Sequence, residues 1–442
     1  MHSGSPWTIA NYPSAIFQEV VAHVESDSDY NTLKALSLTA SSFKTMTQQA
    51  LFRKSRIQGP QTDNPEILQR QTQRIKTLYD IVRCQEELGS YIKTLDFDFG
   101  HCTLPSSETV DQAAYLLSVF KRVERATFSL HRAGVPSFVT DSPLRSALLA
   151  FLQIPSLVHV TFDDFEQLSP AHFLHLGPSV KHLGLINGAF FPYEEIEGFK
   201  MNNDDILVGY EPNAYKELAG KKVVIETLEL DVVSSAMMYV LDKMLESPLC
   251  GLDLSHVNKF VVRSERSIQQ YIDGLGLLYE RFKGSLRVLD TFNGHGFLFP
   301  APFCLGSFPK LQTFKAFLGL HDEGKPELAR FIRFLEDDIR AGSSSLSLLE
   351  VNLTIVISYS RFDEEVERGI WERIAEVLSD ERFKVLERVE LLVMHSRLRE
   401  SSNGALDLVR NLEEWTRAYE EAMKKLHERG ILKVVVAPVN LG

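Results

Sequence analysis

Short apolar or alternating runs recur along the chain from about residue 92 to its last residues. Many share one local form, in which an apolar residue is followed by two polar or mixed residues and then by Leu-x-apolar, as in 92–97, 180–185 and 225–230. Such runs, about four to eight residues long, are typical of β-strands. The pattern predicts strands at 92–99, 123–130, 157–162, 180–186, 224–230, 251–254, 286–292, 311–317, 348–357, 386–393 and 432–436.

The stretches between these runs repeat their apolar residues at the spacing of an α-helix. The stripe through Ala113, Leu117 and Phe120 is one example, and a longer one runs from Ile268 to Phe282. Residues three and four apart lie on the same side of a helix, so each stripe predicts a helix that buries one face. Further helices are expected at 237–245, 328–335, 366–377 and 408–426, the last of them stopped by a glycine at position 430.

Alternation of strand and helix predicts an α/β fold with a parallel sheet. Two arrangements compete: a closed or doubly wound fold, and an open solenoid whose strands line a concave face. A closed α/β barrel has about eight strands in about 250 residues, whereas the runs here number eleven over about 350 residues. Their spacing varies from about 23 to about 45 residues, wider than in regular leucine-rich repeats. We therefore expect a leucine-rich-repeat-like solenoid, a curved parallel sheet with helices on its convex side.

The N-terminal part of the chain has a different pattern. Ile16, Val20 and Val24 follow Pro13 at helical spacing, and a second apolar stretch starts at Leu33. The pattern predicts a small all-helical domain over 7–58, a helical connector over 59–90 and the solenoid over 91–442. Residues 194–217 lose the periodicity and are expected to form an insertion, which at this length is either functional or disordered.

Charge and cysteine usage narrow the partners and the compartment. The formal net charge is −12, and an acidic body repels phosphate, so basic or neutral protein surfaces are favoured over nucleic acid. The four cysteines, at 84, 102, 250 and 304, stand far apart and predict free thiols in a reducing compartment. No run approaches the roughly 20 apolar residues that span a bilayer, and no signal segment is recognised at the N-terminus. A cytoplasmic or nuclear protein without a membrane partner is expected.

No complete catalytic or cofactor motif occurs in the sequence. There is no phosphate-binding GxxxxGK[ST], no HExxH and no GxSxG. His172 and His175 have a spacing that places two imidazoles on one helix side, but no third or fourth metal ligand lies near them in the sequence. We expect no enzyme activity, no cofactor and no metal site.

The N-terminal block resembles an F-box. Residues 13–24 resemble the first helix of that motif, residues 32–43 resemble its second half, and 51–53 resemble its end. It is most similar to the F-box-like domain of fungal proteins that continue into degenerate leucine-rich repeats. The Leu-Pro that usually begins the motif is Tyr12-Pro13 here. The usual Val-Cys-Arg-x-Trp is Thr-Ala-Ser-Ser-Phe at 39–43, so its basic residue and its tryptophan are absent.

This resemblance implies the substrate adaptor of a cullin-based (SCF-type) ubiquitin ligase. The F-box helices would dock on a Skp-type linker, and the repeats would hold an unknown protein target. Ile16, Val20, Leu36 and Phe43 are suited to the core of the block, and Pro13, Phe17, Val21 and Leu38 to the linker surface. The residues expected to form the linker-binding region are Pro13, Ile16, Phe17, Val20, Val21, Val24, Leu33, Leu36, Leu38, Phe43, Leu51 and Phe52.

Other interpretations of the same residues stay open. In one alternative, the apolar side chains of the helical block only dock that block onto the first repeat, since a helical face does not specify what packs against it. The chain would then be a non-catalytic scaffold or ligand-binding repeat protein that does not engage the ligase. A third alternative is an α/β hydrolase or transferase without a recognisable motif.

Overall fold

The computed structural model describes residues 21, 30–39, 41–58, 64–98, 107–129, 143–163, 173, 175–186, 222–231, 251–264, 269–293, 305–320, 331–336, 346–357, 364–395 and 405–438. The described chain falls into two compact units. The first contains the described residues up to Lys181 together with Lys222 and Val223, and the second contains the rest. Among the described residues, no helix is long and apolar enough to cross a membrane.

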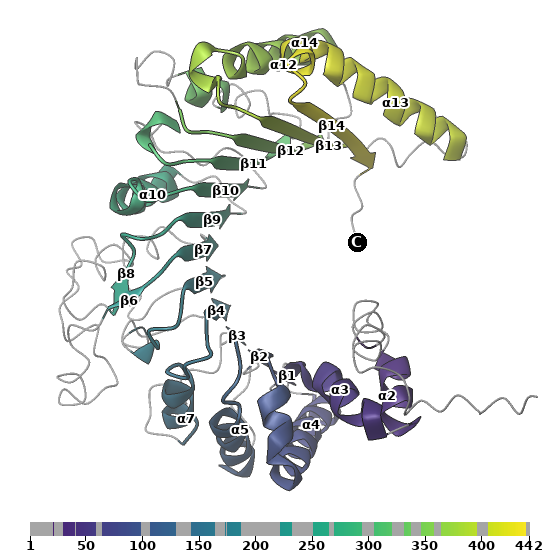
Figure 1. Ribbon diagram of the computed structural model, residues 1–442, viewed down its shortest axis with the longest axis vertical. Helices are drawn as coiled ribbons and strands as arrows, with labels where there is room; N and C mark the ends of the chain where they lie inside the picture. The colour runs from purple at the N-terminus through teal and green to yellow at the C-terminus, as the bar shows by residue number, and fades with distance from the viewer. Residues whose placement is uncertain are drawn as a thin grey trace, which may run out of the picture. The chain divides into compact units, whose positions relative to one another are not determined.

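The first unit begins with two short helices, α2 (Tyr30–Thr39) and α3 (Ser41–Phe52), drawn in purple in Figure 1. They pack against each other around a small apolar core. Its buried residues are Val21, Leu33 and Ala50, and Leu36, Met46 and Leu51 pack half-buried around them. The predicted helical character of this segment is confirmed for the described residues.

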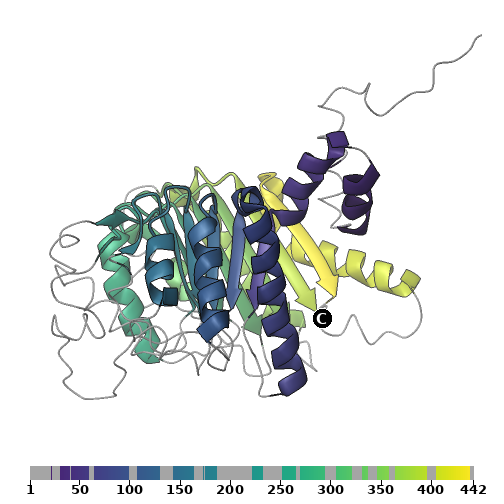
Figure 2. The same cartoon turned by 90° about the horizontal axis from the view of Figure 1, so that it is seen from below.

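A parallel sheet follows in the first unit. Its described strands lie in chain order: β1 (Lys54–Gln58), β2 (Thr94–Asp98), β3 (Arg125–Ser129) and β4 (His159–Asp163). One face is covered by α4 (Pro65–Cys84), α5 (Ser107–Val119) and α7 (Pro143–Phe151), as Figure 2 shows. The short 3-10 helix η2 (Glu86–Tyr91) leads into β2. Because α4 connects β1 to β2, the expected connector is the crossover helix of the first repeat.

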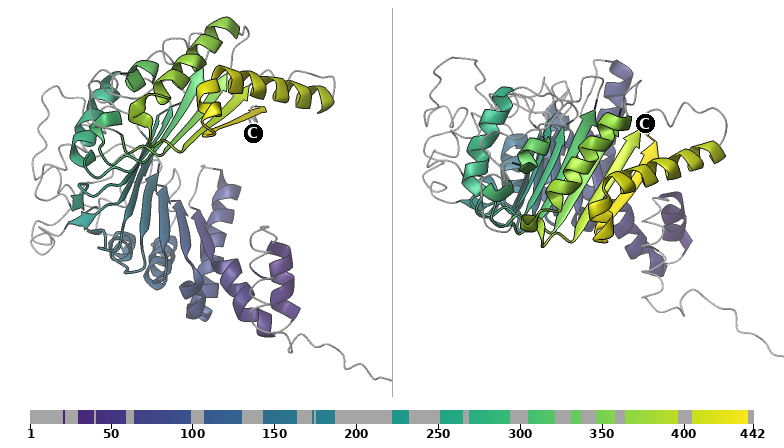
Figure 3. Two further views of the ribbon diagram at one scale, coloured as in Figure 1. Left: turned by 45° about the horizontal axis from the view of Figure 1, so that its top comes forward. Right: turned by 90° about the horizontal axis from the view of Figure 1, so that it is seen from above.

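The second unit repeats the same construction over more strands. Its described parallel strands lie in the order β5 (His182–Ile186), β7 (Thr227–Asp231), β9 (Lys259–Ser264), β10 (Val288–Asn293), β11 (Thr313–Leu320), β12 (Glu350–Ile357), β13 (Arg388–His395) and β14 (Leu432–Pro438). The helices α10 (Gln269–Phe282), α12 (Glu364–Leu378), α13 (Ala405–Ala422) and α14 (Lys424–Glu428) lie on one face of this sheet (Figure 3). The 3-10 helices η5 (Leu305–Ser307) and η6 (Glu381–Phe383) precede β11 and β13, and β6 (Val223–Val224) and β8 (Leu252–Asp253) form a separate two-stranded sheet.

Ten of the described strands are entered in the same way, whereas Gly430 and the half-buried Phe52 stand in this position before β14 and β1, respectively. Two residues before the strand stands an apolar side chain that is at most 3% exposed, and the residues in this position are Ile92, Val123, Leu157, Val180, Ile225, Val257, Leu286, Leu311, Leu348 and Leu386. The next two N–H groups commonly donate to a single carbonyl of the preceding repeat, as Arg287 and Val288 do to Asn258, at N···O distances of 2.7 and 2.8 Å. The apolar anchor and the shared carbonyl together fix the register, because a slip by one residue would expose every inward side chain.

Aromatic rings fill the space between sheet and helices in the first unit. Phe128 of β3 has its ring centroid 6.4 Å from that of Phe97 on β2 and 5.9 Å from that of Phe162 on β4. It also meets the ring of Phe151, in α7, edge to face at 5.8 Å. All four rings are buried. Equivalent positions of adjacent strands stack directly because the strands are parallel and in register.

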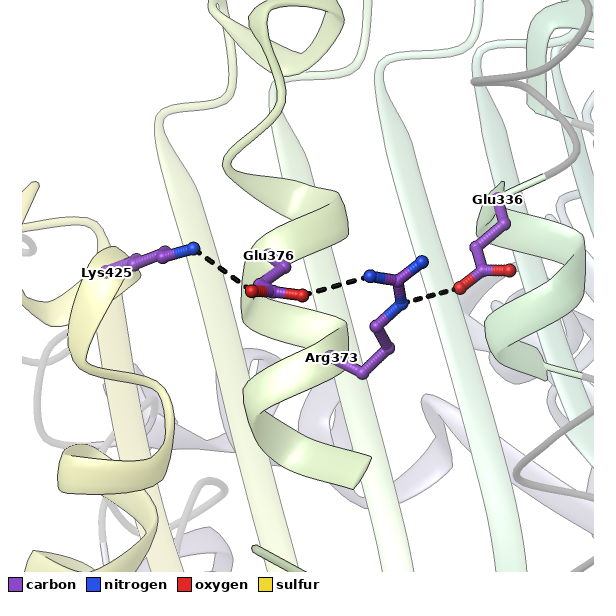
Figure 4. Close-up of polar contacts among 4 residues, drawn as sticks. All are labelled: Glu336, Arg373, Glu376 and Lys425. Carbon is purple, nitrogen blue, oxygen red and sulfur yellow. Dashed lines mark hydrogen bonds and ion pairs between the residues drawn. The ribbon is translucent and has the colours of Figure 1, made fainter. Parts of the chain in front are cut away.

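Ion pairs connect the helix layer of the second unit. Arg373 of α12 lies between Glu336, in the helical segment 331–336, and Glu376 of α12, with N···O distances of 2.7 and 3.0 Å (Figure 4). Lys425 of α14 approaches the other oxygen of Glu376 at 3.3 Å. These hydrogen bonds to Arg373 and Lys425 lower the pKa of Glu376. Single exposed pairs contribute little, but a chain of four charges over three helical segments favours their alignment.

Most of the predicted elements that fall on described residues are confirmed, and the exceptions have local causes. The helix predicted at 237–245 lies outside the described residues. The run at 251–254 forms β8 of the small sheet, and the strand that joins the main sheet is β9. Charges at both ends of β9, Lys259 and Arg263, hide its apolar centre in the sequence. The strand β1 was not predicted, because its five residues include a single apolar one, Ile57. The helix expected at 408–426 is broken at Met423, and Gly430 follows it with a φ of +70° as expected.

Candidate functional site

The sheet of the second unit has one face that no described helix covers. Side chains alternate along a strand, so the residues between the buried positions of β10 to β14 point to this side. Leu289 and Thr291, for example, are buried toward the helices, and Asp290 between them is on the opposite face. We call the outward residues of β10 to β14 the open face (Figure 1).

One row of the open face is polar throughout. The parallel register places one residue from each of five neighbouring strands side by side. In strand order these residues are Asp290, Lys315, Asn352, Glu390 and Lys433. Negative, positive and amide groups thus follow one another at the strand spacing of about 4.8 Å. We call this the polar row.

The next row along the same strands is mainly apolar. In strand order its described side chains are those of Phe317, Thr354, Leu392 and Val435. Val435 is 37% exposed, and Phe317, Thr354 and Leu392 are half-buried. We call this the apolar row. A chain bound across both rows would be oriented by hydrogen bonds to the polar row and would bury apolar area on the apolar row.

The two rows line a single hollow of about 590 Å³. All five residues of the polar row line the hollow, and all of them except Asn352 carry a formal charge. The hollow is also lined by Phe317, Thr354, Leu392 and Val435. The volume lies within the range of about 300–1,000 Å³ that ligand sites occupy. The hollow therefore has room for one or two side chains of a partner.

One end of the polar row is internally neutralised. Glu390 accepts from Lys433 at 2.5 Å and from Arg388 at 3.0 Å, and Arg388 also lies 3.7 Å from Glu350. The hydrogen bond from Lys433 is the main reason that the pKa of Glu390 is lowered. These charges satisfy one another, so they shape the hollow more than they attract a ligand.

The other end of the polar row is not satisfied within the described structure. The side chains of Asp290 and Lys315 make no hydrogen bond or ion pair with another described residue, although the backbone carbonyl of Lys315 accepts from the Thr291 hydroxyl at 3.2 Å. The side-chain oxygen of Asn352 is buried and has no hydrogen-bond partner among the described residues. Partial burial raises the pKa of Asp290, although Lys315, Lys259 and Arg263 act in the opposite direction. Unpaired polar groups of this kind are costly, which makes them candidates for contact with a ligand.

Toward β5 the register of the polar row passes through Val261 of β9 and Glu229 of β7, and Glu229 pairs with charged groups of the neighbouring rows. Glu229 of β7 lies 2.8 Å from Arg263 of β9 and 3.6 Å from His182 of β5. Glu229 is mostly buried, with 14% of its side chain exposed. Its charge is balanced by Arg263, so this part of the sheet offers a ligand less than the unsatisfied groups at Asp290 and Asn352 do.

The residues predicted to bind a linker protein are distributed between core and surface. Val21 and Leu33 are buried in the core of the helical block, where Val21 was expected to remain partly exposed. The residues Leu36, Leu51 and Phe52 are half-buried, Leu38 lies in α2 and Phe43 lies in α3. Pro13, Ile16, Phe17, Val20 and Val24 lie outside the described residues, as does the predicted insertion at 194–217.

A second hollow, of about 460 Å³, lies within the first unit beside α3. Its wall combines side chains of the helical block with the loops that precede β2 and β3. The lining residues are Val21, Met46, Gln49, Ala50, Arg53, Ser90, Tyr91, Lys93, Arg122 and Glu124. Lys93 and Glu124 pair at 2.8 Å, and this hydrogen bond lowers the pKa of Glu124. The hollow thus lies between the helical block and the first repeats, and both contribute lining residues.

The described residues contain no assembled metal site. No three His, Cys, Asp or Glu side chains among them are grouped to hold an ion. His175 lies 3.5 Å from the side-chain nitrogen of Gln153, and burial lowers its pKa. His172 lies outside the described residues. Cys84, the described cysteine, is exposed and reduced.

The open face was not predicted as a site, although a signal for it exists in the sequence. When the strand-forming runs are aligned on their buried residues, one outward position falls between the two inward ones, as in Leu289-Asp290-Thr291, Phe314-Lys315-Ala316 and Val351-Asn352-Leu353. That position carries a charged or amide side chain in each of these repeats. Alignment of the repeats would therefore have revealed the polar row before its geometry was known.

None of the protein-family models matches the chain, and no curated protein matches it. The function is therefore best judged from the surfaces of the two units. The two surfaces that bear on function are the open face of β10 to β14 and the helical block of α2 and α3.

Proposed function

We propose that the chain is a non-catalytic receptor that holds a protein target on the open face and delivers it to a cullin-based ubiquitin ligase. In this proposal the helical block that includes α2 and α3 acts as an F-box-like module and docks on a Skp-type linker. The repeats form a degenerate leucine-rich-repeat-like solenoid. The observation that carries the proposal is the hollow of about 590 Å³, in which unsatisfied polar groups lie beside an apolar row.

The chemistry of the open face favours binding over catalysis. The hollow is lined by carboxylates, lysines, an amide and apolar side chains. The described wall contains no cysteine, histidine or serine that would act as a nucleophile or its base. The lining residues of the hollow come from five strands, which suits a segment of chain better than a small molecule.

The delivery half of the proposal depends on the helical block. Its described core is small, with three buried residues, and so small a block has more apolar residues than it can enclose. Leu36, Leu51 and Phe52 remain half-buried. The resemblance of residues 13–24, 32–43 and 51–53 to an F-box supplies the identity of the partner.

Co-purification of the full-length chain with a Skp-type linker tests this half. The wild type is expected to retain the linker. The double change Pro13→Ala with Phe17→Ala should weaken retention by roughly a hundredfold, as loss of two central apolar anchors does in other interfaces. A second double change, Lys44→Ala with Thr45→Ala, alters exposed positions of α3 and should leave retention unchanged. Circular dichroism checks that each variant is folded.

Failure of the wild type to retain the linker would refute the ligase role. Equal retention by wild type and by the Pro13/Phe17 variant would leave the role in place and refute the assignment of those two residues. A linker that is lost equally from the Lys44/Thr45 control would show a general disturbance of the block.

A second function is favoured by a specific observation. Val21 and Leu33 are buried in the block itself, and α3 contacts both β1 and η2. A block packed in this way is suited to cap the first repeat, since terminal repeats of solenoids need a cover for their apolar end. The chain would then be a target-binding scaffold without a ligase, and the wild type would not retain the linker.

A further inference from the structure

We infer that the hollow on the open face recognises a basic side chain, arginine or lysine, of the bound segment, with Asp290 and Asn352 as its acceptors. The inference rests on the target-binding half of the proposed function. It adds the chemical class of the target residue and assigns a role to each side chain of the unsatisfied end of the polar row.

The acceptors that the hollow offers are the first support. Asp290 on β10 and Asn352 on β12 are two strands apart in one register row, so their side chains flank a space about 9–10 Å wide. Neither the Asp290 carboxylate nor the Asn352 side-chain oxygen is engaged by another described residue. A guanidinium or ammonium group carries several donors and no acceptor, so it matches two acceptors that lack donors.

The apolar row supports the same choice of ligand. Lysine and arginine carry long aliphatic stems, which pack on apolar surface while the charged end reaches a polar group. Phe317 and Thr354 lie directly beside Lys315 and Asn352, one step further along their strands. A stem lying over Phe317 would place its charge between Asp290 and Asn352. A short acidic side chain would leave this surface unused.

Lys315 lines the hollow and repels a bound cation. Removing its charge should therefore change the affinity for basic and for acidic segments in opposite directions. Lys315 lies between Asp290 and Asn352 in the register, and its side chain is exposed. The exposed ammonium group is able to turn into solvent when a second cation arrives, because a flexible stem of four carbons links it to the backbone. Its removal should therefore strengthen the binding of a basic segment and weaken that of an acidic one.

The charge of the whole chain acts in the same direction. The net charge of −12 attracts basic partners and repels acidic ones at a distance. The open face itself contains nearly balanced charges, so attraction at long range and recognition at short range are separable. Added salt should weaken the first and affect the half-buried contacts less.

Three short peptides, acetylated and amidated and identical except at the centre, test the inference on the full-length chain. Their central residue is arginine, glutamate or glutamine, with leucine and alanine on both sides. Fluorescence anisotropy gives the dissociation constants. The arginine peptide should bind at least about tenfold more tightly than the other two, the scale of one desolvated charge-assisted contact. Spermidine, a cation that lacks the flanking leucine and alanine side chains, should compete poorly with the arginine peptide.

Variants assign the effect to the hollow. Asp290→Asn should weaken the arginine peptide by about tenfold or more, and Lys315→Met should tighten it severalfold. Glu413→Gln, an exposed change on α13 with the same change of net charge as Asp290→Asn, is the matched control and should have no effect. Preference for the glutamate peptide, tighter binding by Asp290→Asn, or no binding of any peptide to the wild type would each overturn the inference.

The two proposals fail in distinguishable ways. Loss of the peptide result with the linker retained would remove the basic-residue recognition and leave the ligase role in place. Binding of the arginine peptide by a chain that does not retain the linker would support the inference and refute the ligase role. The proposed peptide site lies in the second unit and the proposed linker site in the first, so neither measurement depends on the other.

Discussion

The ionised side chain of Asp290 is unfavourable for folding but is suited to binding a basic ligand. It lies half-buried on β10 without a hydrogen bond from another described residue, and this burial raises the pKa of its carboxyl group. An ionised carboxylate in such a place costs folding free energy. The same unpaired charge is what a basic ligand would contact. Asp290 is thus expected to be kept for binding at a cost in stability, as is common in functional sites.

The first prediction follows from the sign of this pKa shift. Because the folded-state pKa is raised, Asp290 stabilises the fold when protonated, and this contribution is lost as the pH rises through the raised pKa. Asp290→Asn should therefore increase the free energy of unfolding at pH 7 by roughly 0.5 kcal/mol, a modest value because the group is partly solvated. Urea denaturation of both proteins between about pH 4 and pH 8 measures the difference.

The pH dependence distinguishes this cause from a general effect of the substitution. The gain should grow with pH and approach zero near the ordinary aspartate pKa of about 4. Glu413→Gln on α13 provides the control and should show no such trend. A variant that is less stable than the wild type at neutral pH would contradict the assignment of Asp290 as a carboxylate whose burial outweighs the attraction of the nearby cations.

Single residues also show what a sequence can and cannot predict here. Inward positions such as Leu289 and Phe314 were predicted because their alternation with polar residues is a physical requirement of a half-buried strand. Outward positions such as Lys315 have no comparable requirement, since the solvent accepts almost any polar side chain there. Their meaning appears only when the register places them side by side.

At the scale of one element, the repeat is held by its apolar anchor before the strand. Leu286 is fully buried two residues before β10, and the following two N–H groups donate to the carbonyl of Asn258. Leu277 belongs to the same repeat but lies on the outer side of α10, 47% exposed. The two leucines therefore offer a matched pair within one strand and helix.

Leu286→Ala should lower the free energy of unfolding by about 2–5 kcal/mol, since it removes buried methyl groups and leaves a cavity. Leu277→Ala should cost less than about 1 kcal/mol, because its side chain is already partly hydrated. Urea titration followed by circular dichroism compares the three proteins. Equal destabilisation by both changes would show that the apolar anchor does not carry the repeat.

Elements were predicted well where their periodicity was long and poorly where it was short. The helix α10 and the strands β10 to β13 have clear patterns over many residues. By contrast, β1 has a single inward apolar residue, Ile57, and owes its existence to pairing with β2. Pairing across 40 residues of sequence (54 to 94 at the strand starts) is a tertiary effect that local propensity does not contain.

For the whole molecule, the two surfaces proposed to bind partners belong to different units of the chain. The helical block around Leu33 lies in the first unit and the hollow around Asn352 lies in the second. An adaptor needs two such surfaces, each able to bind while the other is occupied. The parallel α/β architecture could be predicted from the sequence, whereas the pairing of two binding surfaces in one receptor remains a proposal.

A bridging experiment tests this central claim most directly. The Skp-type linker is immobilised, and the labelled arginine-centred peptide is added with or without the full-length chain. The receptor proposal predicts peptide retention on the linker only when the chain is present. Asp290→Asn should reduce peptide retention by about tenfold or more while the chain remains bound, and the Pro13/Phe17 double variant should strongly reduce retention of both the chain and the peptide. A wild-type chain that binds the linker or the peptide, but never both at once, would contradict the claim.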